Sequence, residues 1–502
     1  MIRPLLPRRL PAESLTVTKP VVDIDTARDE VRPAEGNPDP QIAVIPADLD
    51  VSLAGKLAGL SLPRQIFALA VWPFFQQVLN WFVSAVDTAV AGRLSVAAAN
   101  AIGVAAFIGW LLGLLSMSVG SGGGALIARA VGGRHRGLAN AGLAQTLMLA
   151  LVWGLLVGLI IFLLAPSIGY AAGLRGESLA LSNTYLRILA AGSPLGSLMI
   201  VGGMALSAAG DTRSPFWIML AVNAVNTALT LGLVKLGYGV AGIAIGTASA
   251  WLVGSAITAV VLARPGGPIR LRLHRLAPHR TTINRIIRVA APNLADRFGH
   301  WLGNFVVVML VGYIAVNDIG GEGSALQGAH IVAIRIEAIS FFPGMAFGVA
   351  AATLAGQYLG AGSTRQARRA TLYCWLVGSS LMTLTGLLFI FAPEACARLM
   401  TDRPELLDIS PRLVQLCGYI QFFFGSYLVL AEAMRGAGDT RWPMILSNVS
   451  TWLVRLPAVY ILGVVLEGGI FGVWLALCGE LTVRGLLFIA RFFHGGWLRV
   501  RV

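Results

Sequence analysis

The chain has 502 residues, of which 56% are hydrophobic and only 12% are charged. Soluble proteins carry about 25% charged residues, so this composition excludes an ordinary soluble enzyme or binding domain. The formal net charge of +14 would suit a nucleic-acid-binding protein, but the basic residues lie in short loops between apolar runs. That placement argues against nucleic acid as a partner and indicates a membrane protein.

Residues 1–62 differ from the rest of the chain, because they contain Pro, Asp, Glu and Arg without apolar periodicity. The first ten residues, MIRPLLPRRL, lack the continuous apolar stretch of a secretory signal. We expect a disordered cytoplasmic extension with an amphipathic end near residues 51–64.

From residue 63 onward, apolar runs predict an all-α polytopic membrane protein with about twelve transmembrane helices. These runs must be helical, because no water is available in the bilayer to satisfy their backbone polar groups. The predicted spans are 66–91, 100–128, 141–165, 185–208, 215–236, 240–263, 287–316, 324–357, 371–393, 412–434, 443–466 and 469–491.

A polar phrase occurs twice, as AGDTRSP at 209–215 and AGDTRWP at 437–443, 228 positions apart. The same shift aligns Gly132 with Gly360 and Ala139 with Ala367, which indicates an internal duplication. A shift of six helices predicts two pseudo-symmetric six-helix lobes, residues 63–282 and 283–502. Because six is even, these are parallel repeats about an axis along the membrane normal.

The repeated phrase itself is best interpreted as a tight turn between two helices. Gly210 and Gly438 suit the left-handed conformation that ends a helix, and Pro215 and Pro443 suit the first turn of the next. The residues available to cap that next helix are Asp211, Thr212 and Ser214 in one copy and Asp439 and Thr440 in the other.

Lys and Arg are concentrated in the loops on the same side as the two termini. Positive loops stay in the cytoplasm, so both termini are expected there, in a multi-pass protein of the bacterial inner membrane. The loop at 264–286 could also contact anionic lipid headgroups, but topology explains it sufficiently.

Polar residues within the apolar spans are candidates for function. Gln76, Asn80, Ser84 and Asp87 share one face of the first span. They could line a substrate or ion path, or they could bond neighbouring helices while Asp87 sits near the outer interface.

Spans five and six offer neutral polar groups. Asn223 and Thr227, and likewise Asn226 and Thr230, lie one helical turn apart, and Thr247 lies on the next span. Such residues often bond one helix to another, but beside Asp87 they could complete an oxygen-rich ion site.

Span seven carries Asn293, Asp296, His300 and Asn304 on one face. Asp296 and His300 lie one turn apart and could share a proton, whereas Arg297 could instead pair with Asp296. Either a structural ion pair or a functional site is possible.

Span eight carries His330, Arg335 and Glu337. Arg335 and Glu337 point to different faces of the helix, so each needs a partner from another helix. Four further charged residues are interpreted as structural or interfacial, namely Glu432, Arg455, Glu480 and Arg484.

No catalytic or metal-binding pattern competes with these features. The four cysteines show no paired spacing and are expected to be buried, and the six histidines form no ligand motif. None of the three lysines follows a phosphate-binding glycine loop, so we expect no enzyme activity, no structural metal and no cofactor.

Several stretches together resemble the multidrug and toxic compound extrusion (MATE) family. They are VDTAVAGRLSVAAANAIGV (86–104), the two GDTR-P turns, NAVNTALTLGLVKLGYGVAGIAIGTA (223–248) and GVAAATLAGQYLGAGSTRQARRA (348–370). The resemblance covers about residues 63–492. It implies two six-helix lobes around a central cavity that opens alternately to the two sides of the membrane.

The resemblance also implies roles for individual residues. Asp87 corresponds to an ion-coupling aspartate, Asn223 to an asparagine of span five, and Thr247 to a threonine of span six. Thr227 replaces the family's second Asn or Asp, His300 stands where some members have Glu, and Phe424 stands where they have Asp. These departures favour a proton over sodium as the coupling ion.

We therefore expect a monomeric antiporter in the lipid bilayer that exports organic cations or amphipathic compounds in exchange for protons or sodium. The residues predicted to line its cavity are Gln76, Asn80, Asp296, His300, Glu337 and Arg335. A lipid-linked saccharide flippase of the same superfamily is the nearest alternative, a channel or membrane scaffold is a second, and an intramembrane enzyme is the weakest.

Overall fold

The computed structural model describes residues 53, 55–319, 325–500 and 502, without the side chains of residues 84–89 and 91–93. Within this part of the chain every regular element is a helix, as predicted. Most of the predicted N-terminal extension lies outside the described residues. Of that segment the structure gives the short helix η1 (Gly55–Leu57) and the residues that lead into α1.

The first bundle consists of six long helices: α1 (Leu62–Leu94), α2 (Val96–Gly132), α3 (Arg136–Ala171), α4 (Gly176–Ala208), α5 (Arg213–Lys235) and α6 (Gly239–Ala263). The second bundle follows the short helix η2 (Leu273–Leu276). It consists of α7 (Arg280–Val316), α8 (Ala325–Gly360), α9 (Thr364–Phe391), α10 (Pro393–Arg398), α11 (Pro404–Leu407), α12 (Ser410–Tyr419), α13 (Gln421–Gly436), α14 (Arg441–Val449), η3 (Ser450–Arg455), α15 (Leu456–Tyr460), η4 (Ile461–Val465), α16 (Gly469–His494) and η5 (Gly496–Arg499).

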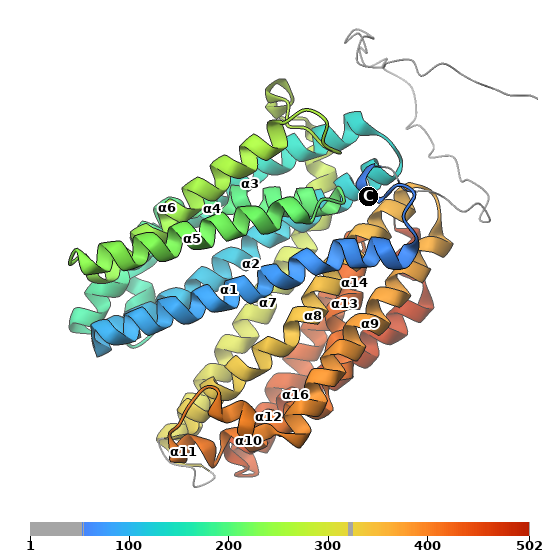
Figure 1. The fold of residues 1–502 in the computed structure, drawn as a ribbon. Coiled ribbons are helices and arrows are strands. Elements are labelled where there is room, and N and C mark those ends of the chain that lie inside the picture. Colours follow the sequence, from blue (N-terminus) through green and yellow to red (C-terminus); the bar gives the residue numbers. More distant parts are fainter. Residues whose placement is uncertain (1–52, 54, 320–324, 501) are drawn as a thin grey trace, which may run out of the picture. The chain divides into compact units, whose positions relative to one another are not determined.

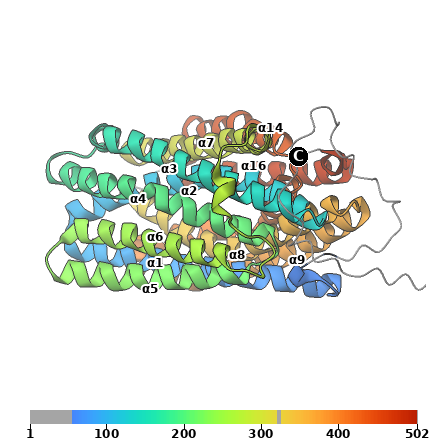
Figure 2. The same cartoon turned by 90° about the horizontal axis from the view of Figure 1, so that it is seen from above.

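Among the described residues, eleven helices are long and apolar enough to cross a membrane, or twelve if one bent pair counts as a single span. The long helices lie lengthwise beside one another (Figure 2). This agrees with the predicted all-α polytopic class. Only some of these helices contact the other bundle.

Two predicted spans are not the continuous α-helices that their hydropathy suggested. The span predicted at 412–434 bends by 59° between α12 and α13. At the bend, the carbonyl of Cys417 accepts a hydrogen bond from the Gln421 side chain at 3.2 Å. The span predicted at 443–466 contains two π-helical segments, η3 and η4, on either side of Pro457, which cannot donate a helical hydrogen bond.

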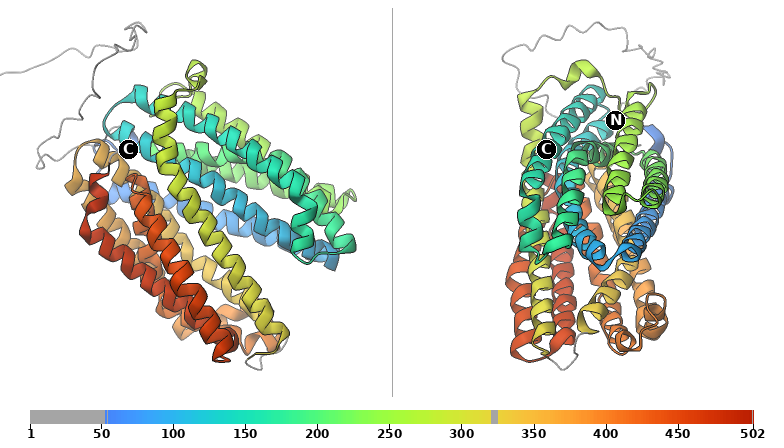
Figure 3. Two further views of the ribbon diagram at one scale, coloured as in Figure 1. Left: turned by 180° about the vertical axis from the view of Figure 1, so that it is seen from behind. Right: turned by 90° about the vertical axis from the view of Figure 1, so that its left-hand side faces the viewer.

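The two bundles meet through α1, α2, α7 and α8: α1 and α2 pack against α8, and α2 packs against α7. The bundles converge at the end where the C-terminus lies and diverge toward the opposite end (Figure 1 and the left view of Figure 3). We call the converging end the closed end. It contains the C-terminal ends of α2 and α8 and the two AGDTR turns, 209–213 and 437–441.

At the closed end the two bundles hold each other by reciprocal contacts. Arg129 of α2 donates to the carbonyl of Ala437 at 2.7 Å, and Gln357 of α8 donates to the carbonyl of Ala208 at 3.0 Å. Gly132 and Gly360 let the helices cross closely, because a Cβ on either would collide with the backbone of the other bundle. Each bundle therefore hydrogen-bonds to the turn region of the other, and we call these contacts of Arg129 and Gln357 the two grips.

Both AGDTR turns have the predicted geometry, with Gly210 and Gly438 each at φ +90°. Their aspartates act differently. Asp211 caps α5 by accepting from the Ser214 backbone N–H at 3.2 Å and also binds Lys56 at 2.7 Å. Asp439 is instead bound by Arg491 of α16 at 2.7 Å.

Candidate functional site

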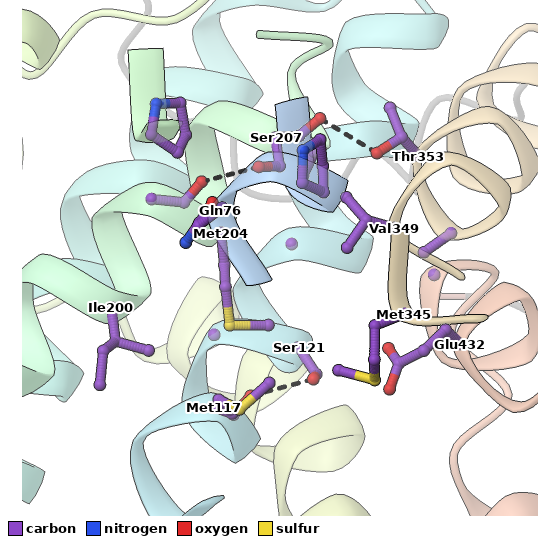
Figure 4. Close-up of a pocket in the computed structure, with 18 of the residues that line it drawn as sticks. Gln76, Met117, Ser121, Ile200, Met204, Ser207, Met345, Val349, Thr353 and Glu432 are labelled. Carbon is purple, nitrogen blue, oxygen red and sulfur yellow. Dashed lines mark hydrogen bonds between the residues drawn. The ribbon is translucent and has the colours of Figure 1, made fainter. Parts of the chain in front are cut away.

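A cavity of about 490 Å³ lies between the bundles, toward the closed end. Seven helices line it: α1, α2, α4, α5 and α6 of the first bundle, and α8 and α13 of the second (Figure 4). Because both bundles contribute walls, any relative motion of the bundles changes the shape of this cavity.

Most of the cavity wall is apolar and adaptable. Five of the twelve methionines of the chain line it: Met117, Met199, Met204, Met219 and Met345. Trp251 adds an aromatic surface. Flexible, polarizable thioethers can repack around ligands of different shapes, so this lining suits apolar or aromatic compounds without a fixed outline.

The polar face predicted for the first span meets this cavity. Gln76 and Asn80 line it together with Gln77, whose Oε1 accepts a hydrogen bond from Asn80 Nδ2 at 3.4 Å. The side chains of Ser84 and Asp87 lie outside the described residues. The structure therefore places two members of the predicted face at the cavity and does not describe the other two.

An ion cluster of α7 and α13 adjoins the same cavity. Arg435 donates to Asp296 at 2.6 Å and to Glu432 at 2.7 Å, and Arg297 contacts Glu432 at 3.4 Å. Glu432 and Arg435 belong to the cavity wall. Asp296 thus binds a guanidinium of another helix, and the structure contains neither the Asp296–His300 pair nor the Asp296–Arg297 pair considered from the sequence.

Three other predicted cavity residues do not line this cavity. His300 lies half-buried beside Trp110, with ring centroids 6.3 Å apart, and its Nδ1 has no hydrogen-bond partner among the described residues. Glu337 accepts a weak hydrogen bond from the Cys417 thiol at 3.2 Å, and Arg335 is exposed.

In the predicted polar group of spans five and six, the hydrogen bonds that the structure describes centre on Asn226. Asn226 accepts from Thr230 at 3.0 Å and donates to Thr247 at 3.5 Å. Asn223 is buried and its Nδ2 has no described partner, while Thr227 is half-buried. The pairing of Asn226 with Thr230 at one-turn spacing was the sequence signal that could have identified this centre.

The second bundle contains a further charged cluster in its interior. Glu480 binds Arg455 and Arg484, each at 2.6 Å, and all three side chains are at most 4% exposed. Ser450 donates to Glu480, and Arg484 donates to Thr451 at 2.6 Å. These contacts pair the Glu480 carboxylate with both guanidinium groups inside the bundle.

The family model described as MatE matches residues 73–231 and again residues 292–461. The chain is similar to the probable multidrug resistance protein NorM of Thermotoga maritima, with 26% identity over 439 residues that cover 86% of this chain and 93% of that protein. It is also similar to the multidrug resistance protein PmpM of Pseudomonas aeruginosa, with 24% identity and coverage of 85% and 90%.

Solved structures share the fold. A MOP superfamily transporter from Pyrococcus furiosus, whose binding pocket is described as having reverse polarity, matches with a TM-score of 0.80 and 20% identity over 88% of this chain and 98% of that chain. The MATE transporter VcmN of Vibrio cholerae, in a mutant form, matches with a TM-score of 0.79 and 18% identity over 87% of this chain and 98% of that chain.

Proposed function

This chain belongs to the MatE family of membrane transporters, and on that premise we propose that it is a secondary active antiporter that exports cationic or amphipathic organic compounds in exchange for protons. The observation that carries the proposal is the cavity of about 490 Å³ whose walls come from both bundles. A cavity between two bundles that are gripped at one end suits alternating access.

The proposed orientation follows from the basic loops. Arginine-rich segments flank the closed end, so this end faces the cytoplasm and the cavity opens toward the outside when the grip is formed. Cysteine labelling of intact cells would test it: a cysteine introduced at the closed end by Thr364→Cys should react with a membrane-impermeant maleimide only after permeabilisation.

The proposed coupling residue is Asp87 on α1, assisted by the hydrogen-bonded group of Asn226, Thr230 and Thr247 on α5 and α6 of the same bundle. Protonation of Asp87 from outside would change the relative stability of the two bundle arrangements and release the substrate. Moving one charge across 100 mV supplies about 2.3 kcal/mol, which is enough to bias such an equilibrium.

Proteoliposomes test the exchange directly. Ethidium transport should follow an imposed proton gradient and should not follow a sodium gradient of equal size. The Asp87→Asn variant should fold normally, yet it should neither transport ethidium nor protect a drug-sensitised host. If this variant gave resistance at the wild-type level, Asp87 would have no part in the mechanism. If a sodium gradient alone drove transport, the coupling ion would be sodium and not the proton.

The flippase alternative would need a basic lining to hold a lipid-linked diphosphate. Among the described lining residues the basic group is Arg435, and it is bound by two carboxylates. The lining therefore supports the cation exporter over the flippase.

A further inference from the structure

We propose that Glu432 is the carboxylate that selects cations in the central cavity, and that Arg297 is its resident counter-ion, which a bound organic cation replaces. This inference rests on the proposed function, because it specifies how the exported compound is recognised. It goes beyond that function in assigning the recognition to a residue that the sequence pattern suggested was structural.

The first argument is the composition of the cavity wall. Among the described residues that line it, Glu432 and Arg435 are the ionisable ones. The Glu432 side chain is 20% exposed, and its carboxylate lies beside Met345 where α8 and α13 form the wall (Figure 4). Among the described lining residues, Glu432 therefore offers the carboxylate that a cation in this cavity can pair with.

The second argument is the unequal strength of the two guanidinium contacts. Arg435 is held from both sides, at 2.6 Å by Asp296 and at 2.7 Å by Glu432. Arg297 approaches Glu432 at 3.4 Å, which is too long for a strong charge-assisted hydrogen bond. Arg297 is therefore the partner that a ligand can displace.

The third argument concerns the geometry at the carboxylate. Both arginines contact the same oxygen, Oε1 of Glu432. In the part of the chain that the structure describes, no hydrogen bond engages the second oxygen, Oε2. That oxygen can accept an ammonium group or lie against a delocalised cation while Arg435 keeps the carboxylate in place.

Charge balance gives the arrangement its selectivity. Asp296, Glu432, Arg297 and Arg435 sum to zero when the cavity is empty, so the cluster is compensated without ligand. An incoming cation needs a carboxylate partner in this cavity, and Glu432 becomes that partner when the Arg297 side chain leaves its 3.4 Å contact. A neutral compound of the same shape gains nothing from this exchange.

Binding to the purified full-length protein tests the proposal with two probes of related shape, cationic tetraphenylphosphonium and neutral triphenylphosphine oxide, measured by isothermal titration calorimetry. Glu432→Gln should weaken tetraphenylphosphonium binding about tenfold, the usual effect of losing one charged contact, and change triphenylphosphine oxide binding less than about twofold. Arg297→Gln should tighten tetraphenylphosphonium binding severalfold. Glu394→Gln and Arg398→Gln remove an exposed ion pair outside the cavity and should leave both affinities unchanged.

The outcomes separate the two proposals. If the wild-type protein transports ethidium but Glu432→Gln binds tetraphenylphosphonium normally, the role of Glu432 is refuted while the exporter stands. If Glu432→Gln misfolds and binds neither probe, the Arg297→Gln variant tests the proposal instead. Tighter tetraphenylphosphonium binding by Arg297→Gln cannot come from misfolding, because a misfolded protein does not gain affinity. Unchanged or weaker binding by Arg297→Gln overturns the counter-ion exchange. A wild-type protein that binds no cation overturns both.

Discussion

Arg129 and Gln357 stand 228 residues apart and occupy corresponding places on α2 and α8, but they grip the opposite bundle differently. Gln357 makes one neutral hydrogen bond, to Ala208. Arg129 is charged and holds two carbonyl groups, those of Ala437 and Val500. The duplication has kept the crossing of the two helices, while the strength of the two grips has diverged.

The interiors of the two bundles differ in the same way. Asn223 and Thr227 of the first bundle correspond, at the same shift, to Thr451 and Arg455 of the second. The second bundle fills this region with a charged cluster in which two guanidinium groups share one carboxylate, Glu480, whereas the polar group of the first bundle is neutral. The interiors of the two bundles therefore differ in charge as well as in hydrogen bonding.

The largest expected effect comes from breaking the charged cluster. Glu480→Gln leaves two buried guanidinium groups without a carboxylate and should destabilise the protein by about 3–5 kcal/mol. Thr230→Val removes one neutral hydrogen bond in the first bundle and should cost about 1 kcal/mol. Thermal unfolding in detergent measures both, and equal losses would show that the two interiors do not differ as described.

An intermediate effect is expected at the closed end. Arg129→Ala removes charged hydrogen bonds and should weaken the grip by about 1.5–3 kcal/mol, while Gln357→Ala should weaken it by about 1 kcal/mol. Spin labels at Arg136 and Thr364, the first residues of α3 and α9, would report the separation of the bundles. Arg129→Ala should increase the fraction of separated molecules more than Gln357→Ala. The reverse order would contradict the asymmetry of the grips.

The smallest effect is expected at the aspartates of the two turns. Burial alone would raise the pKa of Asp211, but hydrogen bonds from Lys56 and Ser214, with the charge of Lys56, lower it below its ordinary value. The resulting stabilisation is complete above the unfolded pKa of about 3.9 and is lost as the pH falls through the lowered folded pKa.

Asp211→Asn should therefore lower the stability of the protein at pH 7. At a pH below the lowered pKa of Asp211, where the wild-type carboxyl is protonated, the variant and the wild type should be equally stable. Lys56 is 55% exposed, so Lys56→Gln should cost less than about 1 kcal/mol and less still in high salt. Arg491→Gln at the second turn should cost more, since Arg491 is 11% exposed. Thermal unfolding across pH and salt measures each difference.

Local sequence patterns predicted the spans, the repeated turns and the family, because apolar length and turn chemistry depend on neighbouring residues. The partners across the bundles were not predictable in this way. Asp296 and Arg435 are 139 residues apart and meet only through packing. The bend before Gln421 was not predicted for a related reason. Hydropathy measures the length of an apolar run, but it does not show that the Cys417 carbonyl accepts a hydrogen bond from the Gln421 side chain.

The methionine-rich wall supplies the cavity with side chains that oxidants can modify. An oxidant small enough to enter would convert thioethers such as Met204 and Met345 to sulfoxides, which are polar and chiral. The damaged cavity would favour other compounds than the native one, and methionine sulfoxide reductases could restore it. Oxidative stress would then alter which compounds a cell can expel before it alters how much transporter the cell contains.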